Sequence, residues 1–378
     1  MTRSLPGLPD QQVNALRTSR GWVGRLQSAA TKVGVKVIPW VPTRAVRLLA
    51  GGRSVTIDGN TLDPTLQLML SGQRALGVDG LAVRDDVAAS RALMRETCLG
   101  FAGPQVHVGV SDLSIPGPAG QIPARHYRPT TAGPAPLLVF YHGGGWTIGD
   151  LDTHDALCRL TCRAAEVHVL SIDYRLAPEH PAPAAVDDAY AAFRWAHEHA
   201  GELGAIRGKV AVGGDSAGGN LAAVVSQLAR NDRATQDPPG PLPVLQWLIY
   251  PRTDFTAQTR SMSLFAEGFL LTKHDIDWFE KQYLGASDIE PTDPRVSPLL
   301  ADDLSGLPPA LIATAGFDPL RDEGDRYAAA LRAAGTPVDL RSTGSLTHGF
   351  ASLFPLGGGS AVATTELVSA LRAHFSRV

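Results

Sequence analysis

Short apolar segments alternate with helical segments through most of the chain after residue 130, and this alternation limits the fold most strongly. Apolar runs of this length, each bounded by Gly or Pro and followed by helical spacing, are typical of strands buried on both faces. They predict a mostly parallel α/β sheet covered by helices on both sides. The predicted strands are 136–141, 167–174, 209–214, 244–251, 309–316 and 338–343, and the predicted helices are 153–165, 183–200, 220–231, 322–335 and 364–377.

Three segments lie outside this alternation. Residues 1–104 have mostly helical patterning, and we expect them to form a separate N-terminal part. A Pro/Gly turn between two alternating segments predicts a β-hairpin at the start of the larger domain, 105–378. The segment 252–300 interrupts the alternation and contains a helix that Thr272 and Asp275 begin as a capping box. Its place near the carboxyl end of the sheet predicts that it covers a pocket.

Composition and charge exclude several classes of protein. The chain is 44% hydrophobic and 19% charged, and its net charge of -3 gives no general attraction to nucleic acid. The three cysteines, Cys98, Cys158 and Cys162, are too few for a disulfide framework, and no second ligand pair accompanies the last two, so we expect buried thiols and no metal. No apolar run approaches the roughly 20 residues of a membrane span, and no signal peptide is visible, so a cytoplasmic protein is expected.

The first 53 residues are strongly basic. They hold nine Lys and Arg residues but a single acid, Asp10, and apolar residues from Trp22 to Trp40 lie between the basic ones. Two interpretations stay open: a solvated helical arm packed on the rest of the protein, or an amphipathic surface that touches anionic lipid. The oligomeric state cannot be read from the sequence.

The motif Gly214-Asp215-Ser216-Ala217-Gly218 lies between a predicted strand and a predicted helix. A serine in such a G-x-S-x-G turn adopts strained backbone angles, and the glycines on either side let the chain bend without a clash. The hydroxyl then projects above the sheet at a helix N-terminus, where negative charge is favoured. We therefore expect Ser216 to be a nucleophile.

A serine nucleophile needs a base that a carboxylate orients. In parallel-sheet hydrolases these partners follow the serine in the order Asp or Glu, then His. Asp318 comes after the predicted strand 309–316, and His348 comes after "VDLRSTGSLT" (338–347). Each is expected to follow a strand directly, so both can reach the sheet edge that carries Ser216. Activity is expected to fall as acid protonates His348. The acids Asp322, Glu323 and Asp325 are expected to serve the dipole of the next helix, and His154, His180, His197 and His199 to be surface or capping residues.

Three glycines, Gly143, Gly144 and Gly145, directly follow the strand 136–141. Acyl transfer places negative charge on a carbonyl oxygen, and bare backbone N–H groups can approach that oxygen closely only where side chains are absent. The glycines and the N–H of Ala217 are therefore predicted to bind this oxyanion, and His142 is predicted to hold the loop by hydrogen bonding.

With these motifs the chain resembles the hormone-sensitive-lipase-like family of α/β-hydrolase carboxylesterases. The motifs that carry the resemblance are "HGGGW" (142–146), "DYRLAPEHPAPAAVDDA" (173–189), "GGDSAGGN" (213–220), "GFDPLRDEG" (316–324) and "THGF" (347–350), in order. The GDSAG form of the elbow points to the bacterial-type branch.

The resemblance implies a small-molecule ester substrate, an α/β-hydrolase fold, the triad Ser216–Asp318–His348, and neither metal nor organic cofactor. It makes Gly144 and Gly145 the donors that accompany Ala217. It also implies that the N-terminal helices and the segment 252–300 form a cap over the active site, and Arg175 and Glu179 are expected to form internal ion pairs.

Several alternatives remain at the level of sequence. The same triad could cleave amides or peptides, a relative of this fold could bind ligands without catalysis, and the basic arm could mark a lipid-surface protein whose activity is secondary. Short- to medium-chain acyl esters are the expected substrates because a cap restricts access. Trp146 is expected to add bulk near the acyl site. Five aromatic residues could line the pocket or belong to the core, with core favoured: Phe265, Phe269, Trp278, Phe279 and Tyr283.

Overall fold

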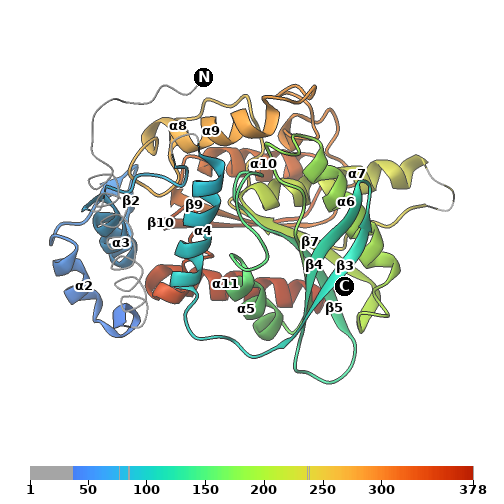
Figure 1. Ribbon diagram of the computed structural model, residues 1–378, viewed down its shortest axis with the longest axis horizontal. Helices are drawn as coiled ribbons and strands as arrows, with labels where there is room; N and C mark the ends of the chain where they lie inside the picture. Colours follow the sequence, from blue (N-terminus) through green and yellow to red (C-terminus); the bar gives the residue numbers. More distant parts are fainter. Residues whose placement is uncertain (1–36, 76, 84–85, 236, 238, 378) are drawn as a thin grey trace, which may run out of the picture.

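A single eight-stranded sheet forms the centre of the molecule in this computed structural model. The structure describes residues 37–75, 77–83, 86–235, 237 and 239–377. The strand order is β10-β9-β8-β7-β5-β6-β4-β3 (Figure 1). The strands are β3 (Gly109–Gly117), β4 (Gly120–Arg128), β5 (Ala135–Tyr141), β6 (His168–Ile172), β7 (Ala205–Asp215), β8 (Gln246–Ile249), β9 (Ala310–Phe317) and β10 (Val338–Thr347).

The sheet is mostly parallel, as the alternation predicted. From β6 to β10 all neighbours pair in parallel, whereas β4 pairs antiparallel with both β6 and β3. The predicted hairpin is therefore the β3–β4 edge of the sheet. Every residue of β5, β6, β8 and β9 except Pro136 is buried, which is why these strands are mostly apolar.

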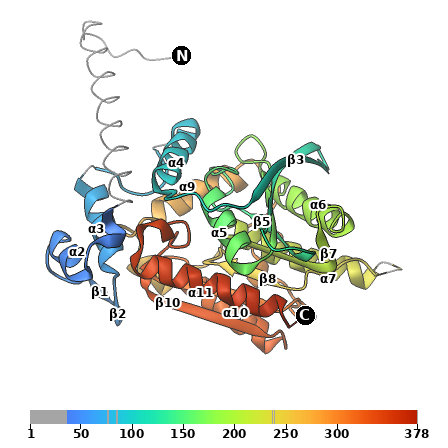
Figure 2. The same ribbon diagram turned by 90° about the horizontal axis from the view of Figure 1, so that it is seen from below.

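Helices cover both faces of the sheet, each with its own apolar cluster. On one face lie α6 (Ala184–Glu198), α7 (Ala217–Thr235) and α10 (Arg321–Ala333). On the other lie α5 (Asp155–Ala165) and α11 (Gly358–Phe375) (Figure 2). The strand ends and the helix N-termini of this layered arrangement meet at one edge of the sheet.

The described part of the N-terminal segment lies beside this layered body (Figures 1 and 2). It contains η1 (Ile38–Trp40), α2 (Thr43–Leu49), a small hairpin of β1 (Thr56–Ile57) and β2 (Asn60–Thr61), α3 (Pro64–Ala75) and α4 (Val87–Phe101). The segment 252–300 holds α8 (Arg260–Leu264), α9 (Lys273–Leu284) and η2 (Pro298–Leu300). Most of the basic residues of the arm, up to residue 36, fall outside the described residues.

The carboxylate of Asp275 joins these two segments. Thr272 and Asp275 form the predicted capping box at the start of α9. Asp275 also accepts hydrogen bonds from the backbone of Leu81 at 3.0 Å and of Ala82 at 2.8 Å. One buried acid therefore begins α9 and fixes the connection between α3 and α4.

The terminal helix α11 begins at Gly358, six residues before the predicted start. From the sequence alone, the glycines at 357–359 indicate a loop before this helix. In the structure Asp63, which accepts a hydrogen bond from Thr65 at the start of α3, also accepts one from the N–H of Gly359 at 3.0 Å. A carboxylate from a distant segment thus caps α11, and local sequence could not predict it.

No helix in the described part of the chain combines the length and the apolar character that crossing a membrane requires.

Candidate active site

Ser216 occupies the tight turn between β7 and α7. Its φ of 55° lies in the left-handed region, which a residue with a side chain adopts only under constraint. The turn needs the glycine at 218 because a Cβ there would overlap the carbonyl oxygen of Tyr141 on β5. The elbow is therefore pressed against the neighbouring strand, with the serine at its tip.

His348 and Asp318 meet Ser216 at the carboxyl edge of the sheet. The imidazole Nε2 lies 2.9 Å from Ser216 Oγ, and Nδ1 lies 2.8 Å from Asp318 Oδ2. Asp318 directly follows β9 and His348 directly follows β10, two neighbouring parallel strands. The three side chains predicted from separate parts of the sequence are thus in one hydrogen-bonded chain.

The carboxylate of Asp318 is fully buried and fixed on both oxygens. Its Oδ1 accepts a hydrogen bond from the backbone N–H of Leu320 at 2.8 Å, while Oδ2 faces the imidazole. The ring of Tyr250 lies 4.6 Å from that of His348, centroid to centroid. These contacts leave the imidazole little freedom to rotate.

Glu323 differs from the expectation that it serves the dipole of α10. Its side chain is fully buried and accepts hydrogen bonds from Arg252 and from the backbone of Thr253 and Asp254. Burial raises the pKa of this carboxyl to about 7, against the opposing charge of Arg252. Glu323 therefore holds the start of the segment 252–300 on α10.

The glycine loop lies beside the serine, and the backbone of its last two glycines has positive φ. Gly144 has a φ of 117°, and a Cβ there would overlap the carbonyl oxygen of Ile148. Gly145 has a φ of 57°, and a Cβ there would overlap the ring of Phe279. Both glycines line one cavity together with Ser216 and Ala217. The predicted oxyanion donors are thus adjacent to the nucleophile.

Asp215 and His154 form a buried pair beneath this loop, so the prediction of a surface position for His154 is wrong. His154 does occupy the N-cap position of α5, but its side chain makes no capping hydrogen bond. His154 is 1% exposed, and its Nε2 lies 3.2 Å from Asp215 Oδ1. The same carboxylate accepts a hydrogen bond from the N–H of Gly143 at 2.9 Å. Burial raises the pKa of Asp215, but the charge and hydrogen bonds of His154 and Gly143 outweigh it, and the pKa lies below its ordinary value.

His142 contacts the loop as predicted, and it is neutral. Its Nδ1 lies 2.7 Å from the carbonyl oxygen of Gly143, and its ring stacks on Tyr174 at 4.3 Å. Burial and the nearby His154 lower the pKa of His142 to about 4. A neutral ring with Nδ1 protonated can donate to Gly143, which holds the loop from below.

The expected ion pairs of Arg175 and Glu179 are present, with partners that the sequence did not indicate. Arg175 pairs with the buried carboxylate of Asp188 on α6 at 2.8 Å. Glu179 pairs with Arg91 of α4 at 2.7 Å. The second pair connects the N-terminal segment to the sheet domain.

A largely apolar cavity of about 1040 Å³, counting the space at its mouth, opens over Ser216. Its lining comes from three parts of the chain: the strand-end loops, the N-terminal helices and the segment 252–300. The charged members of its lining include Asp215, Arg252 and Glu280. The apolar members contributed by the N-terminal helices and by the segment 252–300 include Met69, Met94, Cys98, Phe101, Leu270, Leu271, Ile276 and Phe279.

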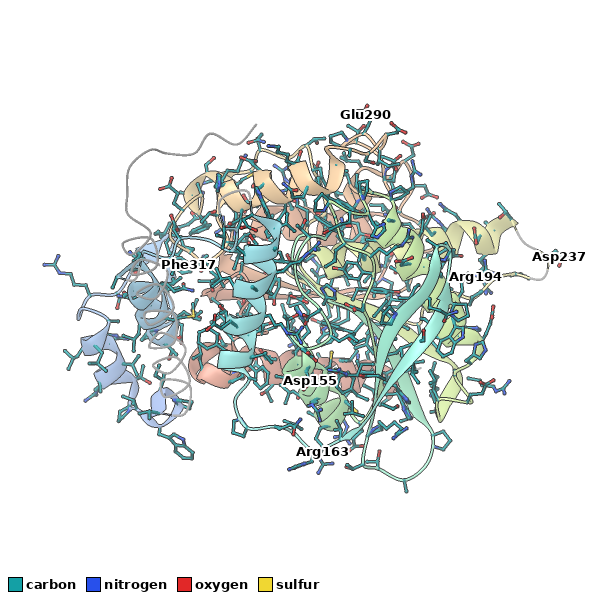
Figure 3. The ribbon with its side chains drawn as sticks, in the orientation of Figure 1. Asp155, Arg163, Arg194, Asp237, Glu290 and Phe317 are labelled. Carbon is teal, nitrogen blue, oxygen red and sulfur yellow. The ribbon has the colours of Figure 1, made fainter. Side chains whose placement is uncertain are left out.

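Of the five aromatic residues considered for the pocket, Phe279 lines the cavity. Phe317, which Figure 3 labels, is the last residue of β9. Phe265 and Phe269 pack on it at 5.5 and 5.3 Å between ring centroids. Tyr283 stacks on Trp146 at 4.5 Å, and Trp278 packs on the edge of Phe279. Trp146 lines the cavity, as expected. Of these five aromatic residues, the four other than Phe279 therefore pack in the core, as predicted.

The thiols of Cys158 and Cys162 are buried on α5, as predicted. Burial raises the pKa of both, that of Cys162 to about 12, so neither is a thiolate at neutral pH. Within the described residues, no three His, Cys, Asp or Glu side chains are grouped so that they could hold a metal ion.

Comparisons with known proteins identify the family of this chain. Residues 138–352 match the family model described as the alpha/beta hydrolase fold. The carboxylic ester hydrolase LipN of Mycobacterium tuberculosis is 72% identical over 379 residues, covering 100% of both chains. Esterase LipI of the same organism is 42% identical, covering 77% of this chain and 90% of LipI. The structure of the ester hydrolase EH1AB1 from the metagenome of Lake Arreo, complexed with a bipyridine phosphonate derivative, superposes with a TM-score of 0.77 at 42% identity, covering 83% of this chain and 99% of that one.

Proposed function

The chain belongs to the alpha/beta hydrolase family, and from this premise we propose how it acts as a carboxylic ester hydrolase. The observation that carries the proposal is the continuous path from Asp318 through His348 to Ser216, with 2.8 and 2.9 Å between the bonded atoms. This path ends in an apolar cavity next to bare backbone N–H groups. Nucleophile, base and oxyanion donors are the groups that acyl transfer requires.

In the proposed mechanism, His348 accepts the proton of Ser216 as the hydroxyl attacks the ester carbonyl. Asp318 fixes the imidazole tautomer and stabilises its positive form. The backbone N–H groups of Gly144, Gly145 and Ala217 receive the oxyanion. His348 then protonates the departing alcohol, and water repeats the cycle on the acyl-enzyme.

We propose residues 1–104 and 252–300 as a cap over residues 105–378. Support comes from α3, α4 and α9, each of which contributes side chains to the cavity, and from Asp275, which bonds one of these segments to the other. Short- to medium-chain acyl groups fit the proposal because the bulky side chains of Phe279 and Trp146 line the cavity near the glycine loop.

Labelling and turnover test this function together. A fluorophosphonate should label the parent chain and leave Ser216→Ala unlabelled, and p-nitrophenyl butyrate should be hydrolysed by the parent alone. Failure of the parent to react would contradict the proposed role of Ser216. A series of p-nitrophenyl esters from acetate to palmitate should give its highest kcat/KM at short or medium length. Matching p-nitroanilides should react far more slowly, and comparable rates would favour an amidase.

A second proposal concerns the outer face of η1 and α2, which we propose contacts an anionic lipid surface. Four apolar side chains are at least half exposed here: Val37 (51%), Trp40 (86%), Leu48 (74%) and Leu49 (68%). Three exposed arginines accompany them, Arg44 and Arg47 on α2 and Arg53 just after it, and residues 37–57 hold no acid. Aromatic and leucine side chains among basic residues are typical of helices that lie in a lipid interface.

Vesicle flotation tests this contact. The full chain should float with vesicles that contain phosphatidylserine, and a Trp40→Ser/Leu48→Ser/Leu49→Ser variant should lose this binding while hydrolysing a soluble ester at the parent rate. Equal flotation of both chains would contradict the proposal. If the parent forms a dimer and the triple variant does not, this face instead binds a second copy of the chain.

A further inference from the structure

One face of α4 carries both cavity-lining and ion-pairing side chains. Arg91, Met94, Arg95 and Cys98 are spaced so that they share this face. Met94 and Cys98 line the cavity, whereas the two arginines reach the loop that follows the three glycines. The helix that shapes the cavity is therefore also bonded to the loop that carries the proposed oxyanion donors.

Arg91 makes four hydrogen bonds from one guanidinium. Its Nε donates to the carbonyl oxygen of Thr147 at 2.8 Å, and its Nη2 donates to the carbonyl oxygen of Ala177 at 3.0 Å. Both terminal nitrogens donate to the carboxylate of Glu179, at 2.8 and 2.7 Å. A planar fork of this kind fixes its acceptors in direction as well as distance.

Thr147 closes the turn that contains the glycines. Its backbone N–H donates to Gly144 O at 3.1 Å, and its hydroxyl donates to Gly145 O at 3.0 Å. The Gly144–Gly145 peptide, which carries the proposed donor N–H of Gly145, and the Gly145–Trp146 peptide therefore take their orientation from Thr147, which is fully buried. Arg91 binds the remaining polar group of Thr147, its carbonyl oxygen.

Trp146, which lies between Gly145 and Thr147, has a φ of 56°, a left-handed conformation that a residue with a side chain seldom adopts. Its carbonyl oxygen accepts a hydrogen bond from Ala177 N at 2.8 Å, and Ala177 in turn is bound to Arg91. Arg91 thus bridges the two chain segments that hold Trp146 in this conformation.

Arg95 binds further along the same loop. Its guanidinium pairs with the carboxylates of Asp150 and Asp152, and Asp150 also accepts hydrogen bonds from the backbone of Asp152 and Thr153. These contacts fix α4 to the end of the loop, beyond the turn that Thr147 closes. Arg95 is therefore a natural control for Arg91, since it joins the same two elements without touching the turn.

We propose that Arg91 is a positioning residue for ester hydrolysis, which holds the glycine turn in its catalytic conformation from the cap helix α4. The inference rests on the proposed function, because it needs Gly144 and Gly145 to receive the oxyanion. Backbone donors stabilise a transition state only while they are aimed at the developing charge, so a loosened turn lowers turnover more than substrate binding. Arg91 touches neither the substrate nor the triad.

Steady-state kinetics on full-length variants test this role. Arg91→Ala should lower kcat by about 10- to 100-fold, less than the loss of a complete oxyanion donor, with KM changed less than about 3-fold. Arg91→Lys should recover little of this, because an ammonium group cannot reach Thr147, Ala177 and Glu179 at once. Millimolar guanidinium should restore part of the lost kcat in Arg91→Ala and leave the parent unchanged.

Two matched variants separate positioning from general stability. Glu179→Gln removes the ion pair but keeps the bond from Arg91 to Thr147, so it should lower the melting temperature with kcat near that of the parent. Arg95→Ala should raise KM more than it lowers kcat. A parent-like kcat in Arg91→Ala, or a loss that guanidinium does not restore, would overturn the inference. If the parent hydrolyses esters and Ser216→Ala does not, the proposed function stands in either case.

Discussion

Asp215 is a buried carboxylate directly beside the nucleophile. It precedes Ser216, accepts a hydrogen bond from the N–H of Gly143, and faces the buried imidazole of His154. The carboxylate therefore connects the serine turn to the glycine loop from below, while Arg91 holds the loop from α4. The position of the glycine loop thus depends on two charged groups, Asp215 on one side and Arg91 on the other.

We predict that Asp215→Asn lowers both stability and turnover. The amide keeps an acceptor for Gly143 but removes the charge that faces His154, and a buried hydrogen bond to a charged group contributes about 1.5–3 kcal/mol. The free energy of unfolding should fall by about that amount, and kcat should fall by about 10-fold as the loop shifts. Urea unfolding and ester kinetics measure both.

Asp322→Asn is the matched control, because Asp322 accepts a hydrogen bond from Ser261 and does not line the cavity. It should leave kcat unchanged. A normal kcat in Asp215→Asn would show that the charge of Asp215 does not hold the loop.

At the scale of helices and strands, the start of α9 shows how two nearby residues can have different roles. The only role of Thr272 is in the capping box at the start of this helix. Asp275 completes the box and also binds the backbone of Leu81 and Ala82. The same helix start therefore contains one residue with a local role and one that joins two parts of the chain.

We predict that Thr272→Ala lowers the free energy of unfolding by about 1 kcal/mol with little change in KM. Asp275→Ala should cost more and raise KM, because it also frees the connection that leads into α4. Thr259→Ala, which removes the cap of α8, is the control for a purely local loss. Equal KM values for Asp275→Ala and Thr272→Ala would contradict the joining role of Asp275.

His126 of β4 and His168 of β6 form a second test at this scale. Their facing nitrogens are 2.9 Å apart, and both side chains are buried. Burial, with the charges of His168 and Arg128, lowers the pKa of His126 to about 4 from an ordinary value of 6.5. Burial also lowers the pKa of His168. Both rings are neutral in the native state at neutral pH.

At this pair, the unfolded chain therefore binds more protons than the native chain between pH 6.5 and about 4. The contribution of this pair to stability is complete above pH 6.5 and should fall through this window by about 1–3 kcal/mol. His126→Gln should flatten the decline, measured as melting temperature against pH, and the exposed His107→Gln should not. The same slope in His126→Gln and the parent would assign the acid sensitivity to other groups.

At the scale of the whole molecule, the N-terminal segment and the sheet domain share one core. Leu66 and Leu70 of α3 are buried in the same apolar cluster as β9 and α11. Polar contacts add to this: Asp58 pairs with Arg260 at 2.7 Å and with Arg321 at 2.9 Å. Parts joined through a common core are expected to unfold together.

We therefore predict a single thermal transition in which ester hydrolysis and helical circular dichroism are lost at the same temperature. Loss of activity well below the circular dichroism transition would contradict this, because it would mean that the proposed cap separates before the sheet unfolds.

The sequence by itself determined the strand–helix alternation, the serine turn, the glycine loop and the positions of Asp318 and His348. These features are read from neighbouring residues, because apolar periodicity and turn chemistry act over a few positions. The structure brings Ser216 and His348 together from 132 positions apart, and strand order in a parallel sheet makes that meeting predictable.

Only the tertiary structure decided the roles of Asp63, His154 and Arg91, and the second role of Asp275, which binds the backbone of Leu81 and Ala82 in addition to capping α9. Each is a polar or charged residue whose partner lies in another element: Asp63 caps α11 from 296 positions away, and Asp275 binds Leu81 across 194. A local pattern marks such a side chain as a loop or surface residue. Folding buries or encloses it, and a buried polar group must find a partner wherever the packing places one.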